Sequence, residues 1–131
     1  MKKIITAVFS DLDNKNIRLE LDNSLSPKTF QAILDHLPVK VKINRWGDEL
    51  YTDPTEIEVI EKNGKTEVNE LDVAYWPEGR AICLFFGPTP ISKDGKILAY
   101  SPVNIVGKII DPPVKDDLLD YVESKTTVII N

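Results

Sequence analysis

The sequence predicts a mainly β protein, a closed antiparallel barrel of about eight short strands with a helix across each end. Three observations lead to this prediction. Apolar or alternating segments dominate the chain, turn residues separate most of them at short intervals, and only two stretches have helical periodicity. With 131 residues and 42% hydrophobic side chains, residues 1–131 are expected to form a single domain with a substantial core.

The candidate strands are recognised by alternation and by their flanking turns. Ile17, Leu19 and Leu21 alternate with charged residues, as in a strand with one face in water. Asn63-Gly64, between two short apolar segments, predicts a tight hairpin. The candidate strands are residues 4–9, 17–21, 39–44, 57–60, 66–68, 73–76, 81–86, 103–110 and 126–130.

Two helices are expected. Ser26-Pro27 is a typical helix start, an apolar stripe follows at helical spacing, and Pro38 ends the pattern, so the first helix is predicted from Pro27 to Leu37. A shorter amphipathic helix is predicted from about Val114 to Tyr121. The residues expected in the core are Phe30, Ile33, Leu34, Phe85, Ile105 and Ile109.

The stretch from Leu71 to Pro90 has the densest group of aromatic residues and a clear strand-turn-strand signal. Pro77-Glu78-Gly79 is turn chemistry, and the prolines of Gly87-Pro88-Thr89-Pro90 end the second strand. One interpretation is a central hairpin of the β core. The other is that Tyr75, Trp76 and Phe86 also line a pocket.

Composition and charge exclude several classes of function. The net charge of −5 is unlike the basic surface of nucleic-acid-binding proteins and unsuited to anionic lipid. Cys83 is the only cysteine, so an internal disulfide is excluded, and its apolar surroundings predict an inert buried side chain. His36 is the only histidine, which favours neither a metal site nor a serine triad. No cofactor, nucleic-acid partner or membrane partner is expected, and a cytoplasmic protein is predicted.

A glycine-containing bend, Arg45-Trp46-Gly47-Asp48-Glu49, leaves two interpretations open. It is either a bulge at a strand edge with solvated charges or the rim of a ligand site, where arginine and tryptophan are favoured. Asp48 and Glu49 are a poor acid–base pair, because adjacent residues on a strand point to opposite faces.

The order of elements resembles the cyclophilin fold, and three segments are similar to cyclophilin motifs. Ser26-Pro27-Lys28-Thr29-Phe30 is similar to the opening of the first cyclophilin helix, Cys83-Leu84-Phe85-Phe86 to a Ser-Gln-Phe-Phe strand, and Val106-Gly107-Lys108-Ile109 to a Phe-Gly-Lys-Val strand. The chain more closely resembles a small prokaryotic family of cyclophilin-like proteins, whose hallmark segments span residues 44–51, 72–77, 83–90 and 101–108.

Polar and aromatic residues cluster in these hallmark segments, which predicts a groove on the barrel with apolar walls and a few polar groups. An arginine beside aromatic rings favours a peptide segment or a small ligand with a carbonyl or carboxylate group. The predicted ligand contacts are Arg45, Trp46, Tyr75, Trp76, Leu84, Phe86, Thr89 and Asn104. Weak prolyl isomerisation is the alternative: Phe86 matches a catalytic position by motif and Arg45 by approximate place, but Leu84 stands where the enzymes have glutamine. A structural domain whose aromatic residues form a homodimer interface is the third possibility.

Overall fold

The structure, a computed structural model, describes residues 1–62, 64–110, 118–122 and 124–131. Within this part of the chain the strands lie in one antiparallel sheet, with one α-helix and one short 3-10 turn. In chain order the elements are β1 (Lys2–Phe9), β2 (Lys15–Asp22), α1 (Pro27–His36), β3 (Val39–Trp46), β4 (Glu49–Thr52), β5 (Lys65–Val68), β6 (Asp72–Trp76), β7 (Ala81–Phe85), β8 (Ile97–Ile109), η1 (Leu119–Tyr121) and β9 (Thr126–Ile130).

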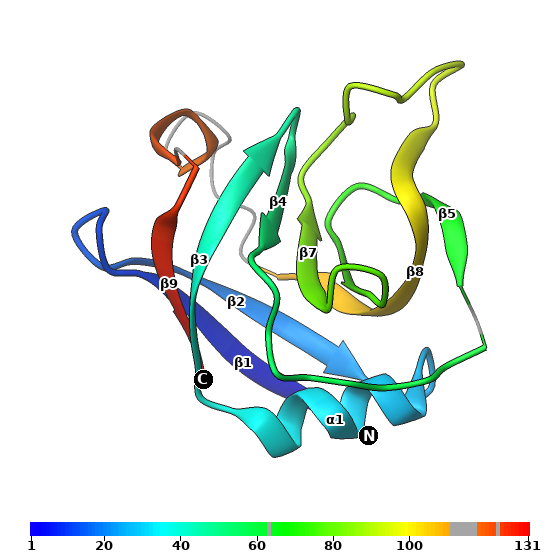
Figure 1. Cartoon of the computed structure of the whole chain (residues 1–131), viewed down its shortest axis with the longest axis horizontal. Helices are drawn as coiled ribbons and strands as arrows, with labels where there is room; N and C mark the ends of the chain where they lie inside the picture. The colour runs from blue at the N-terminus through cyan, green and yellow to red at the C-terminus, as the bar shows by residue number, and fades with distance from the viewer. Residues whose placement is uncertain (63, 111–117, 123) are drawn as a thin grey trace.

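The sheet closes into a barrel, as the sequence predicts (Figure 1). Its strand order is β2-β1-β9-β3-β4-β7-β6-β8, and β8 pairs back onto β2, while β5 is added at the far edge of β8. The closing pair sets Gly107 opposite Leu21. A Cβ at Gly107 would lie 2.2 Å from the Glu20 carbonyl oxygen, so only glycine lets the two backbones approach this closely.

The barrel core lies inside this closed sheet. On β2 the alternating residues Ile17, Leu19 and Leu21 are buried, with charged residues between them facing outward. Helix α1 crosses one end of the barrel, and η1 lies at the opposite end (Figure 1). Phe30 of α1 and Leu119 of η1 belong to the same buried cluster as the strand residues, so both elements cover the core from the two ends.

A second apolar cluster lies on the other side of the barrel wall. We call it the outer cluster; its buried members are Val68, Ala74, Cys83, Phe85, Ala99 and Val103. The alternation along β7 explains the separation, because Ile82 and Leu84 belong to the barrel core while Cys83 and Phe85 belong to the outer cluster. Strand β8 is long enough to close the barrel with its second half and to cover the outer cluster with its first half.

Two expectations about the elements need correction. The second helix was predicted from about Val114 to Tyr121, but the described part of that segment is only the turn η1, and residues 111–117 lie outside the described residues. Residues 57–60 form no strand, and β5 pairs with β8 instead. The reason is that Ile57 is anchored by side chains: the Tyr75 hydroxyl donates to its carbonyl, and its N–H donates to Thr55 Oγ1. The turn residue 63 itself is outside the described residues.

The predicted core is correct in four of its six positions. Phe30, Ile33, Phe85 and Ile109 are buried. Leu34 and Ile105 are only half-buried, packing against the barrel core and the outer cluster respectively. For Ile105, a register shift between β6 and β8 near Val73 and Ala74 changes the regular alternation on which the prediction depended.

Candidate functional site

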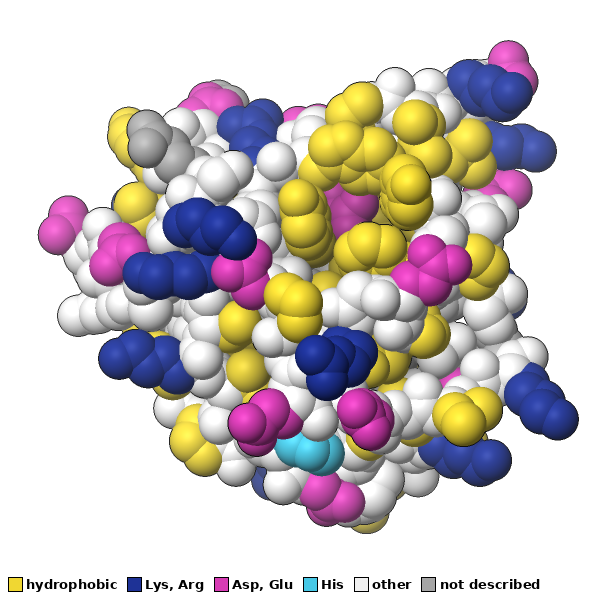
Figure 2. Space-filling model, viewed as in Figure 1, with side chains coloured by type: hydrophobic (Ala, Val, Ile, Leu, Met, Phe, Trp, Pro, Cys, Tyr) yellow, Lys and Arg dark blue, Asp and Glu magenta, His cyan; other side chains and the backbone are white. Residues whose placement is uncertain are grey.

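A cavity opens on the outer face of the barrel, above the outer cluster. We call it the aromatic cavity; its volume is about 220 Å³ and it is lined by Trp46, Glu49, Tyr51, Trp76, Cys83, Ala99, Tyr100 and Val103. Figure 2 shows it as a hollow ringed by hydrophobic side chains, with an acidic side chain at its bottom. Among the described lining residues Glu49 is the only charged one.

The rim of the cavity consists of aromatic rings packed edge to face. The Trp46 and Tyr100 ring centroids are 6.2 Å apart with planes at 73°, and those of Trp76 and Tyr100 are 6.0 Å apart at 76°. The Tyr100 side chain is at the mouth, where the residue is 69% exposed. Edge-to-face packing is a favoured arrangement of aromatic pairs, so the three rings support one another around the opening.

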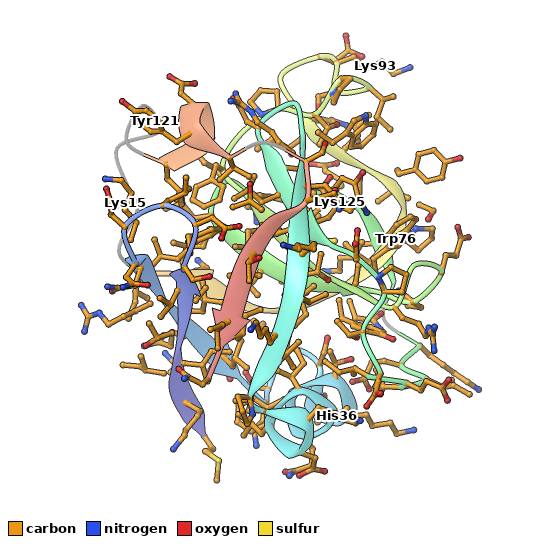
Figure 3. The ribbon with its side chains drawn as sticks, turned by 60° about the vertical axis from the view of Figure 1, so that its left-hand side comes forward. Lys15, His36, Trp76, Lys93, Tyr121 and Lys125 are labelled. Carbon is orange, nitrogen blue, oxygen red and sulfur yellow. The ribbon has the colours of Figure 1, made fainter. Side chains whose placement is uncertain are left out.

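Trp76 is held firmly by its neighbours. Its indole Nε1 donates to Ser101 Oγ at 2.6 Å, and that hydroxyl donates to Glu78 Oε2 at 3.0 Å. A Cβ at Gly79 would lie 2.3 Å from Cε3 of the ring, so the glycine in the β6–β7 turn leaves the space that the indole occupies. Figure 3 shows Trp76 well away from His36, which lies at the end of α1 and is not among the lining residues.

The β3–β4 turn places Trp46 and Glu49 at the cavity. Gly47 has φ +61°, a left-handed conformation that favours glycine, and it packs against the segment from Pro88 to Pro90. The Asp48 N–H donates to the Pro88 carbonyl at 2.9 Å. Trp46 and Glu49 are directly opposite in the β3–β4 pair, so the bend brings both residues to the cavity.

Glu49 is buried at the bottom of the cavity, with 5% of its surface exposed. Burial raises the pKa of its carboxyl from 4.5 to about 7, and a hydrogen bond from the Cys83 thiol acts in the opposite direction to a smaller extent. The pKa of the Cys83 thiol is in turn raised well above its usual value, by burial first and by Glu49 second. A carboxyl that changes its charge near neutral pH therefore faces an apolar cavity.

The structure separates the residues that the sequence groups into one ligand site. Trp46 and Trp76 line the aromatic cavity. Tyr75, Leu84 and Phe86 are at most 1% exposed and belong to the barrel core. Because successive strand residues face opposite sides, residues adjacent in the motifs fall on different faces of the wall.

The three remaining predicted residues make contacts within the fold. Arg45 Nη1 donates to the Leu119 carbonyl at 2.7 Å and lies 3.4 Å from Asp120 Oδ1, while Nη2 lies 3.3 Å from Asp48. Thr89 Oγ1 donates to the Leu98 carbonyl. Asn104 is fully buried opposite Tyr75, and its side-chain amide has no hydrogen-bond partner among the described residues.

Sequence reasoning missed Glu49, Tyr51, Cys83, Ala99, Tyr100 and Val103 as lining residues. The sequence placed Glu49 in a bend that could form the rim of a ligand site, and considered Asp48 and Glu49 a poor acid–base pair. The structure agrees that the two are separate, because Asp48 pairs with Arg45 in the turn. The signal for Glu49 was the alternation Glu49-Leu50-Tyr51: if Leu50 is in the barrel core, Glu49 and Tyr51 must share the outer face.

No group of three or more His, Cys, Asp and Glu side chains is placed to hold a metal ion in the described ranges. No helix in the part of the chain that the structure describes combines the length and apolarity needed to cross a membrane.

Comparison with known proteins identifies relatives of the fold. A solution structure of a hypothetical protein from Archaeoglobus fulgidus is 39% identical, with a TM-score of 0.76 over 99% of this chain and 94% of that one. McbB in complex with tryptophan is 14% identical, with a TM-score of 0.69 over 98% of this chain and 44% of McbB, which shows a shared fold. No curated protein matches. A sequence model of the family described as cyclophilin-like matches residues 6–131, and the chain belongs to this cyclophilin-like family.

Proposed function

We propose that the protein binds a small, mainly apolar organic molecule in the aromatic cavity. The observation that carries the proposal is the Glu49 carboxyl, buried beneath a ring of aromatic side chains in an open hollow of about 220 Å³. Ligand sites typically combine apolar walls with a few polar groups that fix orientation. A perturbed carboxyl in a cleft is also a general indicator of a functional site.

The size of the cavity favours a small ligand. Pockets for drug-sized molecules have volumes of roughly 300–1,000 Å³, so a volume of about 220 Å³ suits a single ring with a short substituent. The likeness to McbB gives limited support, since that protein's structure holds tryptophan, an aromatic molecule with a short polar chain. A long peptide segment would extend beyond the cavity over the rim.

The chemistry of the lining residues limits which polar group the ligand can carry. A ligand carboxylate would meet the Glu49 carboxyl, and the described lining residues include no cationic side chain that could pair with it. Arg45 is engaged with Asp48 and Asp120. A carbonyl can accept a hydrogen bond from the protonated carboxyl, and a basic nitrogen can pair with the ionised carboxyl. The binding proposal holds for either group.

Tryptophan fluorescence provides a direct test, because the only two tryptophans of the chain, Trp46 and Trp76, both line the cavity. We expect benzyl alcohol and benzylamine at pH 7 to change the fluorescence saturably. Small ligands gain at best about 1.5 kcal/mol per non-hydrogen atom and usually much less, so dissociation constants of about 1 mM are expected for these probes.

A blocking variant makes the test specific. Ala99→Phe should fill the cavity, since Ala99 is a buried lining residue, and should abolish the fluorescence change. Ile60→Phe adds the same ring at a position that is 81% exposed and outside the lining, and should bind as the unchanged protein does. Circular dichroism establishes that both variants fold. Absence of saturable binding, or binding unaffected in Ala99→Phe, would show the proposal to be wrong.

The alternative of a homodimer is separated from ligand binding by light scattering. The mouth exposes Tyr100 beside Trp46 and Trp76, so a subunit interface there would close the cavity. A monomer that binds the probes supports the ligand site. A dimer that dissociates in Tyr100→Ala and does not bind them supports the assembly role.

A further inference from the structure

We infer that the aromatic cavity is a site for an organic ammonium, whose positive charge lies against the Glu49 carboxylate with the aromatic rings around it. This inference rests on the proposed ligand site and specifies its ligand class. Three features carry it: a buried acid without a cationic partner, walls of aromatic rings, and an opening that admits a small substituted ring.

The first feature is the missing countercharge. Glu49 on β4 pairs with Trp46 of β3 and with Phe85 of β7, and neither neighbour carries a charge. The other titratable groups that line the cavity are Cys83 from β7, Tyr51 from β4 and Tyr100 from β8, and no described lysine or arginine lines it. A carboxylate buried without a cation is strongly disfavoured, so a ligand that brings the cation gains most from this site.

The nearest arginine in sequence cannot take this role without breaking other contacts. The Arg45 guanidinium donates to the carbonyls of Gly47 and Leu119 and pairs with Asp48 and Asp120. These contacts join the β3–β4 turn to η1. The positive charge closest along the chain is therefore already committed to holding the fold.

The second feature is the aromatic surface. Trp46 and Trp76 each stand at a steep angle to Tyr100, which gives the opening walls of different orientation. The face of an aromatic ring carries partial negative charge and attracts cations, most strongly for tryptophan. A carboxylate at the bottom and ring faces at the sides thus act on an ammonium group in the same direction. A neutral ligand lacks this attraction and gains only the apolar contact and, if it carries an acceptor, a hydrogen bond from the protonated carboxyl.

The proton balance of binding follows from the same geometry. When Glu49 is protonated, entry of R–NH₃⁺ releases the carboxyl proton to solvent and leaves an ammonium–carboxylate pair; no covalent bond of the ligand changes. Because the pKa of the carboxyl is about 7, its ionised fraction is about thirty times greater at pH 8 than at pH 5.5. An aliphatic amine stays protonated across this range, as lysine does. Affinity for an amine should therefore rise with pH.

A neutral ligand that accepts a hydrogen bond from the protonated carboxyl should show the opposite trend. Its affinity should fall as pH rises, because ionisation of Glu49 removes the donor. The sign of the pH dependence therefore distinguishes the two ligand classes in the unchanged protein. This test needs no substitution and does not depend on how a variant folds.

The experiment compares benzylamine with benzyl alcohol, which have the same ring and nearly the same size, by isothermal titration calorimetry at pH 5.5 and 8. We expect benzylamine to bind roughly 30-fold more tightly at pH 8. Benzyl alcohol should bind similarly at both pH values, because its hydroxyl can accept a hydrogen bond from the protonated carboxyl or donate one to the ionised carboxylate. Glu49→Gln should remove the pH dependence and weaken benzylamine, while benzyl alcohol still binds. Glu58→Gln, a carboxyl change at an exposed position paired with Arg80, should leave both affinities unchanged.

The possible outcomes separate this inference from the proposed function. If benzyl alcohol binds and benzylamine binds no better at pH 8 than at pH 5.5, the ammonium inference is wrong and the ligand site stands. If neither molecule binds at either pH, both proposals are wrong. If benzylamine binds with the expected trend and Ala99→Phe abolishes it, both are supported.

Discussion

The carboxyl of Glu49 and the thiol of Cys83 meet at the bottom of the aromatic cavity, and the thiol donates a hydrogen bond to the carboxyl. The two residues come from the adjacent strands β4 and β7. Both side chains are buried, and burial is the main reason that the pKa of each is raised. Because the pKa of the Glu49 carboxyl is raised to about 7, the stability of the protein should depend on pH.

The stability of the protein should fall between about pH 4.5 and pH 7 because of Glu49. With a folded-state pKa raised from 4.5 to about 7, the folded protein binds more protons than the unfolded chain in this window, so folding weakens as pH rises. The full effect corresponds to roughly 3 kcal/mol. Urea unfolding at pH 4.5 and pH 7.5 should show this loss relative to Glu49→Gln; parallel pH profiles for the two proteins would contradict the prediction.

Phe30→Ala should destabilise the barrel by roughly 3–5 kcal/mol, because removal of a buried phenylalanine leaves a cavity in the core. Phe30 is 2% exposed and joins α1 to the barrel core. Ile60→Ala, at a position 81% exposed, is the matched control and should change stability little. Chemical denaturation measures both. An unchanged midpoint for Phe30→Ala would mean that α1 does not cover the core.

Gly107→Ala should weaken the closure of the barrel. The new methyl group would meet the Glu20 carbonyl oxygen at 2.2 Å and Leu21 Cα at 2.9 Å, so β2 and β8 would have to separate. Amide hydrogen exchange should then accelerate at Ile110, whose N–H donates to the Arg18 carbonyl of β2, and at Glu20, which lies opposite Lys108 of β8. Gly95→Asn is a suitable control, since that glycine has φ +73° and open space around it, and asparagine tolerates this conformation. Equal amide protection from exchange in the two variants would argue against the closure of the barrel between β2 and β8.

Arg45→Ala should lower the melting temperature but leave probe binding in the cavity intact. The guanidinium holds the β3–β4 turn to η1 through Leu119 and Asp120 and is not among the lining residues. Thermal unfolding and the fluorescence titration measure the two effects on the same sample. A selective loss of binding with unchanged stability would instead favour the direct ligand contact that the sequence suggests.

An Ala-Pro-Phe peptide should be isomerised slowly or not at all. Phe86, which matches a catalytic position by motif, is 1% exposed in the barrel core, and Arg45 is already bonded to the fold. Neither is available to a peptide on the surface in this arrangement. A protease-coupled assay with an active cyclophilin as reference measures the rate. Turnover of about 1 per second or faster that falls in Arg45→Ala would make isomerisation the better description.

The barrel could be predicted because its local signals agree with one another. The alternation in β2, the helix start at Ser26-Pro27 and the β6–β7 turn each specify an element that the structure contains. The prediction failed where contacts of side chains determine the backbone conformation, because such contacts leave no periodic pattern in the sequence. Residues 57–60 look like a strand, but the contact of Ile57 with Tyr75 fixes this segment without a partner strand.

The candidate site was harder to predict than the fold because it depends on which face of the wall each residue takes. Trp46 and Trp76 were found by their residue type, whereas Glu49 required the register of β4. Tyr100 could not be placed, because the strand was expected to begin at Val103 and β8 begins at Ile97. The six additional residues carry the first half of β8 over the outer cluster, and that half forms one side of the cavity.

The two apolar clusters on opposite sides of one sheet have a consequence for how this scaffold can diversify. Strand alternation assigns Leu50 and Leu84 to the interior, and assigns Tyr51 and Cys83 to the exterior hollow. Mutations at the exterior positions can therefore reshape the hollow while the interior residues that sustain folding stay unchanged. Such a division of tasks makes the exterior positions a natural target for directed evolution of a binding site.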